Sequence, residues 1–181
     1  MDRTEAFGLL KDHLHPPNLI KHSLAAEACM RKLALQLGGD PDLWGLAGLL
    51  HDLDYETTEA TPERHALVSA ELLAGTSVPA LAVHAILAHN GHAGLDEPLD
   101  VALWVVDPTT GFLTACALMH PARKLAPLEL PFLLKRFKEK SFARGANRDQ
   151  IAACSRLGLE LPDFLTLNLA AMTDIAADLG L

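Results

Sequence analysis

Helix-starting signals run along the whole 181-residue chain. Asp40-Pro41-Asp42 and Thr61-Pro62-Glu63 each place a capping side chain before a proline, the residue that suits the first position of a helix. Ala and Leu dominate the apolar segments, and the alternating runs of β-branched residues that indicate strands are missing. The pattern predicts an all-α fold.

The spacing of apolar residues sets the expected helices and their organisation. We expect helices over residues 2–14, 18–37, 41–53, 62–74, 78–89, 98–106 with a continuation after Pro108 to about 119, 128–140, 147–157 and 162–179. Prolines interrupt the chain after residue 120, and the segment that follows turns basic. Because about sixty residues rarely bury enough surface to fold alone, we expect one domain: a helical core over 1–120, with a C-terminal helical extension over 121–181 packed on it.

Charge is distributed unevenly along the chain. The net charge is −8, yet residues 123–156 carry nine of the fifteen Lys and Arg residues and three of the 23 Asp and Glu residues. A general nucleic-acid binder spreads positive charge over a face, so we expect no nucleic acid polymer as a partner. The basic segment still permits a local site for an anion.

Several other classes of protein are also disfavoured. No apolar run approaches the roughly 20 residues that span a bilayer, and the first five residues lack the layout of a secretory signal. We therefore expect a cytoplasmic protein with no membrane partner. Cys29, Cys116 and Cys154 lie far apart and form no Cys-x-x-Cys pair, so we expect buried apolar residues and neither disulfides nor a thiolate metal site.

Two polar features fall where apolar faces are expected. His22 shares the three-and-four spacing of an apolar stripe in the second expected helix, and His51-Asp52 ends the apolar run at 46–50. An imidazole followed by a carboxylate suits a divalent ion of intermediate softness. Both features have structural alternatives: His22 as a hydrogen-bonded core residue, and His51-Asp52 as a helix-end histidine beside a solvated aspartate.

Three further residues extend this set. Asp107 closes the apolar segment at 99–106 on its inward face, where an ionised carboxylate needs a cap, a partner or a metal, and both capping and ligation stay open. His65 follows Pro62, and His89 ends the expected helix 78–89. His84 lies about 140° away from His89 around that helix, so we expect it on the surface or in packing.

These residues occur in the order His22, His51-Asp52, His65, His89 and Asp107. In this order, and in the segments around them at 21–24, 47–56, 62–73, 85–90 and 105–107, the chain resembles the HD superfamily of metal-dependent phosphohydrolases. The resemblance covers residues 18 to about 112. Segments 107–112, 121–124 and 135–144 are also similar to an uncharacterised bacterial subfamily of HDIG-like predicted hydrolases.

The resemblance implies an HD-type helical bundle with one divalent metal ion, Mn, Fe, Ni, Co or Zn. Its implied ligands are His22, His51, Asp52 and Asp107. In two-metal relatives, residues matching His65 and His89 bind a second ion that Asp52 bridges. A further histidine common in those relatives is Asn90 here, and Asp54 replaces the glycine of the His-Asp-Ile-Gly version of the motif.

The chemistry implied is hydrolysis of a phosphate ester or anhydride of a small phosphorylated metabolite or nucleotide by metal-activated water. Two imidazoles and two carboxylates leave positions open on a divalent ion, which lowers the pKa of bound water. We expect Asp52 to be essential for catalysis, with Asp54 or Glu56 as general acid or base.

The basic segment is the expected source of phosphate contacts. The candidates are Lys140, Arg144, Arg148 and Lys124, and the alternative for each is a solvated helix face. Two other functions stay open at this point. One is a non-catalytic signalling or scaffold module on the same fold, although such modules typically lose metal ligands that are filled here. The other is di-iron oxygen chemistry, which Asn90 weakens.

Overall fold

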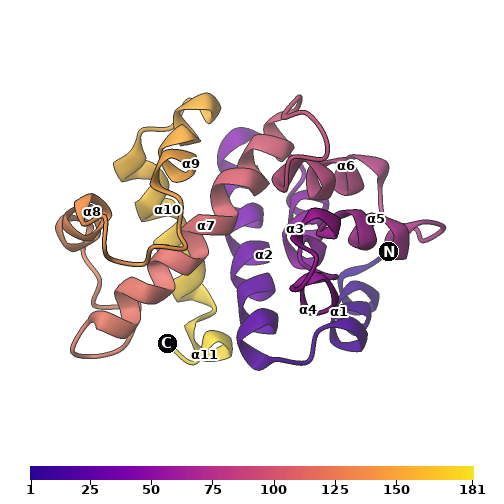
Figure 1. Ribbon diagram of the computed structural model, residues 1–181. Coiled ribbons are helices and arrows are strands. Elements are labelled where there is room, and N and C mark those ends of the chain that lie inside the picture. Colours follow the sequence, from indigo (N-terminus) through magenta and orange to yellow (C-terminus); the bar gives the residue numbers. More distant parts are fainter.

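Two long helices, α2 (Pro17–Leu37) and α7 (Pro98–Met119), pack against each other in the middle of the computed structural model, which describes residues 1–181 (Figure 1). On one side of this pair lie α1 (Arg3–His13), α3 (Pro41–Leu50) and α6 (Ala80–His89). The helices of the C-terminal part lie on the other side. The structure contains helices and no strand, which confirms the all-α prediction.

The close approach of α2 and α3 depends on a glycine. A Cβ atom added at Gly48 would lie 2.8 Å from the backbone oxygen of Ala26 in α2, far inside van der Waals contact. At the start of the same helix, the side chain of Asp40 accepts hydrogen bonds from the backbone of Asp42 and Leu43, as predicted for this cap. Gly48 therefore lets the end of α3 lie directly against α2.

The chain between α3 and α6 is less regular than the sequence predicts. The helix expected to continue to residue 53 ends at Leu50, and α4 (Tyr55–Thr58) is a short extra turn. The expected helix 62–74 is wrong at its start, because Thr61 makes no capping bond and only a 3-10 turn, η1 (Pro62–Arg64), forms there. Ala66 then takes a left-handed conformation with φ 68°, and α5 (Leu67–Leu73) follows it.

Helix α7 continues through Pro108 without a break. Proline has no backbone N–H, so the carbonyl of Trp104, four residues earlier, loses its usual partner in the helix. The side chain of Gln150, from α9 (Arg148–Ala152), donates a hydrogen bond to this carbonyl. The C-terminal part therefore supplies the hydrogen bond that Pro108 removes.

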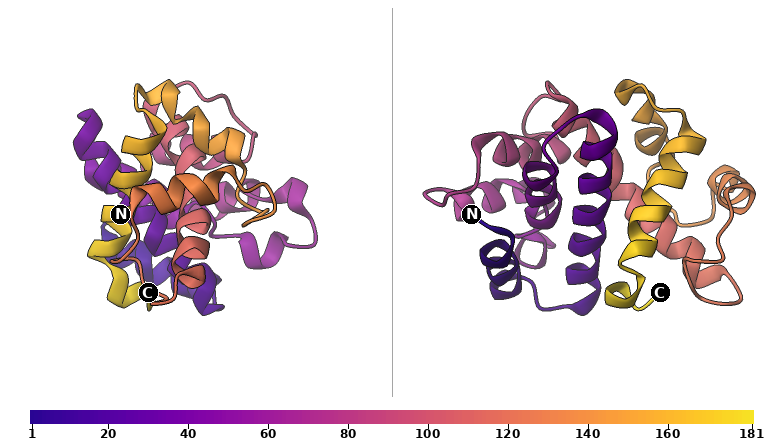
Figure 2. Two further views of the ribbon diagram at one scale, coloured as in Figure 1. Left: turned by 90° about the vertical axis from the view of Figure 1, so that its left-hand side faces the viewer. Right: turned by 180° about the vertical axis from the view of Figure 1, so that it is seen from behind.

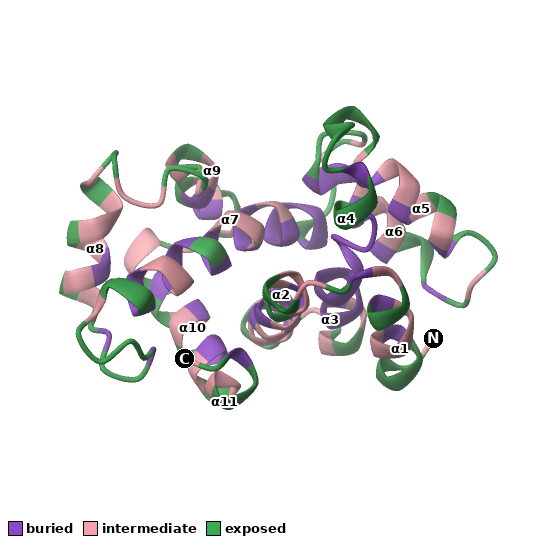
Figure 3. Cartoon of the chain, turned by 60° about the horizontal axis from the view of Figure 1, so that its bottom comes forward, coloured by how far each residue is buried: buried purple, intermediate pink, exposed green.

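The apolar character of α7 corrects one expectation. At 22 residues, α7 is long and apolar enough, by length and composition alone, to cross a membrane. In its most apolar window, however, 61% of the residues are buried inside the protein, so the core of the fold accounts for its composition. Figure 3 shows buried residues along α7 and also along α3. Exposed residues gather toward the outer ends of the molecule.

The C-terminal helices pack on the central pair. They are α8 (Leu130–Lys138), α9, the 3-10 turn η2 (Ala153–Leu157), α10 (Leu161–Asp174) and α11 (Ala176–Leu179). Helix α10 contacts both α2 and α7, and the view from behind shows it running beside α2 (Figure 2). One cluster of 41 buried apolar residues extends from Ala6 to Leu179 and includes all three cysteines, as predicted. The division of the chain at residue 120 stays a prediction.

Candidate metal centre

Six polar side chains from five segments converge beside α2 and α7. They are His22 of α2, His51 and Asp52 directly after α3, His65 after η1, His89 at the end of α6, and Asp107 of α7. The structure thus brings together all six residues that the sequence singled out for metal binding. The irregular chain around η1 is what allows His65 to reach the group.

Two of the histidines are oriented by the helices that they end. The Nδ1 atom of His51 donates a hydrogen bond to the carbonyl of Gly48 over 2.8 Å, and Nδ1 of His89 donates to the carbonyl of Ile86. In both cases the acceptor lies three residues earlier, in the last turn of the helix. Because a carbonyl can only accept, Nδ1 carries the hydrogen, and Nε2 faces the centre.

The other two histidines are oriented by side chains. Thr110 donates to the backbone carbonyl of Asp107, and its hydroxyl oxygen accepts a hydrogen bond from Nδ1 of His22 over 2.9 Å. Nδ1 of His65 bonds to Oδ1 of Asp54 over 2.8 Å. All four Nε2 atoms therefore point inward, each fixed by a bond on the opposite side of the ring. Partners of this kind set the tautomer and ring orientation of metal-binding histidines.

The inward atoms form two groups that share Asp52. The first donor group is His22, His51 and Asp107, and the second donor group is His65 and His89. The Nε2 atoms of His22 and His51 are 3.2 Å apart, and those of His65 and His89 are also 3.2 Å apart.

Asp52 lies between the two groups. Its Oδ2 is 3.4 Å from Nε2 of His22, while its Oδ1 is 3.4 Å from Nε2 of His51 and 3.3 Å from Nε2 of His65. Asp107 completes the first group, with its Oδ1 3.1 Å from Nε2 of His22.

These distances fit bound metal ions. Metal–nitrogen bonds of about 2.0–2.1 Å place neighbouring ligand atoms roughly 2.8–3.4 Å apart in octahedral or tetrahedral geometry. Two neutral imidazoles also cannot bring their Nε2 lone pairs together without a cation between them. Imidazole nitrogens combined with carboxylate oxygens suit Zn, Mn, Fe, Co or Ni. The residues present could therefore hold one ion in each donor group, with Asp52 shared.

The electrostatics of the centre also favour cations. Burial raises the pKa of Asp52, but His51, His65 and His22 outweigh it, and its pKa is lowered overall. The pKa of Asp107 is lowered well below its usual value against the same cost of burial, through His22 and His51. Both carboxylates are therefore ionised at neutral pH.

The same charges and burial shift the pKa values of the histidines in different directions. Burial opposes protonation of His51, yet Asp52 and Asp107 raise its pKa to about 9. For His65, hydrogen bonds to Asp52 and Asp54 outweigh burial and raise the pKa to about 10. Burial and the neighbouring His51 lower the pKa of His89 to about 4. Without metal, protons on His51 and His65 balance the negative charge of the two carboxylates. A bound metal ion would replace these protons.

The centre opens to solvent on one edge only. The side chains of His22 and Asp107 are 22% and 33% exposed, whereas His51 is fully buried. A pocket of about 450 Å³ lies over this edge. Besides the candidate ligands, its lining comprises Leu19, Tyr55, Asn90 and Gln150. A substrate would therefore reach the centre from the side of α2 and α7.

The two expected acid–base residues have other roles in the structure. Asp54 is fully buried, accepts the bond from His65 through Oδ1, and accepts the backbone N–H of Ser69 through Oδ2. Glu56 accepts hydrogen bonds from the backbone N and the ring of His15, and it does not line the pocket. The carboxylate of Asp54 thus orients His65, and that of Glu56 ties α4 to the segment between α1 and α2, while an acid–base role for either residue stays a prediction.

The basic candidates also differ from expectation. The guanidinium of Arg148 donates to the backbone carbonyls of Phe137, Phe142, Ala143 and Ala146, and it stacks over Phe112. Its donors therefore hold the loop between α8 and α9, and its phosphate contact stays a prediction. Lys124, Lys140 and Arg144 are exposed and line neither the pocket over the centre nor the hollows beside it.

Other polar residues near the centre have structural partners. Asn90, at the position where two-metal relatives carry a histidine, lines the pocket and donates to the backbone carbonyl of His65. His84 pairs with Asp100 away from the site, which agrees with the packing role expected for it.

Sequence reasoning missed two residues of the site, Thr110 and Gln150. Gln150 gave no usable signal, because its place depends on how the C-terminal part packs. Thr110 could have been noticed: it lies three residues after Asp107, on the same face of α7.

Comparisons with known proteins agree with this geometry. The HD domain family matches residues 19–109, half of the chain, and these residues include all six that converge at the centre. The chain therefore belongs to the HD domain family, as its motifs predicted.

Named relatives point in the same direction. Ribonuclease Y of Sulfurovum sp. (strain NBC37-1) is 29% identical over 152 residues, which cover 83% of this chain and 28% of the relative. Ribonuclease Y of Aliarcobacter butzleri is 36% identical over 84 residues, covering 46% of this chain and 16% of the relative. The Chlorobium luteolum protein of the same name is 34% identical over 93 residues, 51% of this chain and 18% of the relative. This chain thus spans between 16% and 28% of these relatives, and no solved structure matches it.

The family and the named relatives support a hydrolase of the HD type, as expected. They also overturn one expectation. Net charge led us to exclude a nucleic acid polymer as partner, but these relatives are ribonucleases by name. The exclusion was wrong because net charge averages over the whole surface, whereas a metal centre supplies its own positive charge where a phosphate binds.

Proposed function

We propose that this chain is a metal-dependent phosphodiesterase that hydrolyses RNA. The observation that carries the proposal is the convergence of four Nε2 atoms on two carboxylates, with every histidine fixed through Nδ1. An ordinary buried histidine does not need such an arrangement, whereas a metal centre does. The similarity to proteins named Ribonuclease Y supports RNA as the substrate class.

In this proposal the six convergent residues would hold the metal. A divalent ion bound there would polarise a phosphoryl group and lower the pKa of a water molecule. The protein's own part is positional. Thr110 and Asp54 hold His22 and His65 in orientation, and burial of His51 and Asp52 keeps bulk water from the inner side. The reacting phosphate would lie at the open edge between His22 and Asp107.

The surroundings of that edge also support a chain-like substrate. Hollows of about 390 and 360 Å³ adjoin the central pocket. His22 lines one of them, Asp107 lines the other, and Gly111 lies between them on α7. A nucleotide chain with its reacting phosphate at the centre would find room on both sides.

A second candidate is hydrolysis of a phosphate ester of a single nucleotide. The pocket of about 450 Å³ over the centre favours it, because that volume lies within the range typical of small-molecule sites. The two candidates share the metal centre and differ in what lies beyond the reacting phosphate.

The test is a substrate panel on protein stripped with a chelator and reloaded with Mn, Fe, Co, Ni or Zn. The panel contains single-stranded RNA, DNA of the same sequence, a nucleoside 5′-monophosphate and bis-p-nitrophenyl phosphate. We expect metal-dependent cleavage of RNA that Asp52→Ala abolishes, while Asp12→Asn, at an exposed carboxylate of α1, stays active. Phosphate release from the monophosphate with RNA intact would support the second candidate. No hydrolysis of any phosphoester with any metal would refute both.

A further inference from the structure

A second pocket lies next to the metal centre, between α2, α7 and α11. It has a volume of about 390 Å³, which falls in the range of roughly 300–1,000 Å³ typical of small-molecule sites. His22 lines both this pocket and the one over the centre. The two pockets therefore adjoin at a candidate metal ligand.

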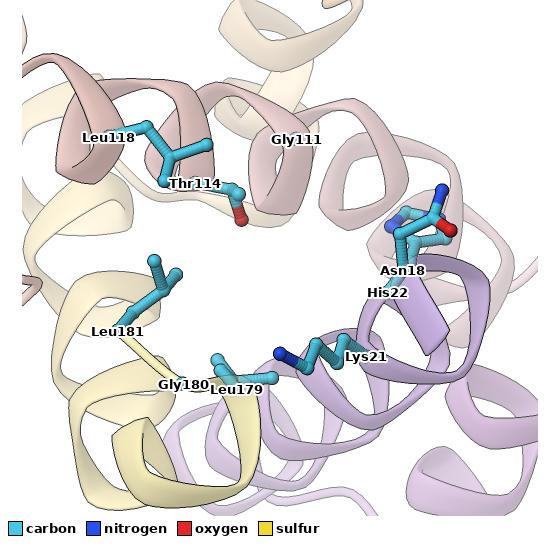
Figure 4. A pocket seen from close by; sticks show the side chains of 9 residues that line it. All are labelled: Asn18, Lys21, His22, Gly111, Thr114, Leu118, Leu179, Gly180 and Leu181. Atoms are coloured by element: carbon cyan, nitrogen blue, oxygen red, sulfur yellow. The ribbon is translucent and has the colours of Figure 1, made fainter. Parts of the chain in front are cut away.

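Three polar side chains face this pocket. Figure 4 shows the ammonium group of Lys21 and the hydroxyl of Thr114 pointing into it, with Asn18 beside His22 at one end. Lys32, the other lysine of α2, pairs with Asp174, whereas Lys21 makes no ion pair or hydrogen bond within the chain. The side chains of Asn18 and Thr114 likewise have no hydrogen-bond partner in the protein. An ammonium, a hydroxyl and an amide that converge without partners can bind an anion such as a phosphate.

The remaining wall is apolar and leaves space at its centre. Leu118 of α7 and Leu179 of α11 form part of it, and Leu118 is 53% exposed. A Cβ atom added at Gly111 would meet nothing within 4 Å, so there is open space over α7 at Gly111, which lines both this pocket and the hollow beside Asp107. Apolar walls around a few polar groups suit a ligand with both an apolar ring and a charged group.

We propose that this pocket holds the nucleotide that adjoins the reacting phosphate. Lys21, with Thr114 and Asn18, binds the phosphate of that nucleotide, and the leucine wall contacts its base. The inference rests on the proposed function, since it assumes that the centre acts on a phosphoester of a nucleotide. It makes Lys21 a specificity residue, in place of the basic residues of the C-terminal part.

The experiment compares Lys21→Ala with the matched control Lys32→Ala, which changes a lysine of the same helix that is already ion-paired. The first measurement is the KM and kcat for 5′-phosphorylated diadenylate and for bis-p-nitrophenyl phosphate, which lacks a second phosphate. We expect Lys21→Ala to raise the KM for the dinucleotide about tenfold, as for loss of one charge-assisted hydrogen bond. The KM for the model diester should rise far less, and bound metal should stay the same. Thr114→Val should act in the same direction with a smaller effect.

The second measurement does not depend on catalysis. Calorimetric titration with adenosine 5′-monophosphate should show binding that Lys21→Ala weakens about tenfold and Lys32→Ala leaves intact. If the wild type hydrolyses no phosphoester yet shows this pattern, the proposed function fails and the pocket assignment stands. If the wild type cleaves the dinucleotide but Lys21→Ala changes neither KM nor nucleotide affinity, the pocket assignment is wrong. Absence of nucleotide binding to the wild type would overturn it too.

Discussion

The two donor groups of the metal centre are built in different ways. In the first group, His22 and Asp107 lie within the long helices α2 and α7, and His51 follows α3 directly. In the second group, His89 ends the short helix α6, and His65 lies on a turn between η1 and α5. The first group is thus positioned by packing of the core, whereas the second joins His89 on a packed helix to His65 on a local turn.

The turn that carries His65 has two supports. Ala66 holds a left-handed φ of 68°, a conformation that costs a non-glycine residue about 1 kcal/mol or more and persists only where its surroundings impose it. Asp54 then fixes the ring of His65 and the backbone of Ser69 together. The first group can therefore be disturbed only through the core, whereas the second can be altered at His65 without disturbing the first. We therefore expect tighter metal binding in the first group.

The largest effect should come from the residue that both groups share. Asp52→Ala removes carboxylate oxygens from both groups and leaves His51 and His65 without their central counter-charge. We expect loss of all bound metal and a fall in kcat of about a thousandfold or more, in keeping with loss of electrostatic stabilisation at a reacting centre. Elemental analysis and kinetics on the same preparation check this. Retention of one equivalent of metal would show that the groups are independent.

A backbone change should disturb the first group through the core. Gly48→Ala places a Cβ against the backbone of Ala26, so α3 must move away from α2 and carry His51 from His22. We expect a loss of about 1–3 kcal/mol in the free energy of unfolding, with activity down about a hundredfold. Denaturant unfolding and kinetics provide the measurements.

Gly8→Ala is the control for that change. It is also a glycine-to-alanine substitution within a helix, in α1, where an added Cβ would meet nothing within 4 Å. Equal effects of the two substitutions would mean that helix composition, and not the approach of α2 and α3, is responsible.

The second group should be removable by itself. His65→Ala deletes one of its two histidines and leaves the Nε2 atoms of His22 and His51 in place. We expect the metal content to fall by one equivalent and activity to fall by roughly tenfold to a hundredfold, with the fold intact. Metal analysis with thermal unfolding tests this, and His92→Ala, at an exposed histidine, is the control. Loss of all metal would contradict the separation of the two groups.

The smallest effect should follow from loosening His65 without removing it. In Asp54→Asn, the amide can accept from only one of the two N–H groups, of His65 and of Ser69, that the carboxylate satisfies. We expect affinity for the second ion to fall about tenfold, the lower end for such orienting partners, while the first ion is unaffected. Competition titration with a metal indicator distinguishes the two ions. An unchanged second affinity would show that Asp54 has only a structural role.

The sequence predicted much of this arrangement because the relevant signals are local or ordered along the chain. Helix periodicity placed His22 and Asp107 on inward faces, local position singled out His51-Asp52, His65 and His89, and the family resemblance joined the six residues into one expected site. Tertiary contacts decided what local patterns could not. Asp54 looked free for acid–base chemistry because nothing in its own segment shows that His65 and Ser69 bind it.

The basic segment shows the same limit of local patterns. Arg148 repeats at four-residue spacing with Arg144 and Lys140, as on a solvated helix face, yet the chain around 139–147 is not helical and wraps its carbonyls around Arg148. The sequence did not predict a binding role for Lys21, because a lysine beside an inward histidine is no signal of one. Its importance comes from a pocket that α11 closes from the far end of the chain.

The hydrogen bond from Gln150 to the carbonyl of Trp104 has a consequence for how this protein is divided. The family match stops at residue 109, in the middle of α7, yet α7 runs ten residues further and relies on Gln150 to complete its backbone at Pro108. The family match thus ends inside a helix, short of the unit that folds here. A fragment cut at the family boundary would sever the helix that carries Asp107, so exchange of this domain between proteins would have to bring α9 with it.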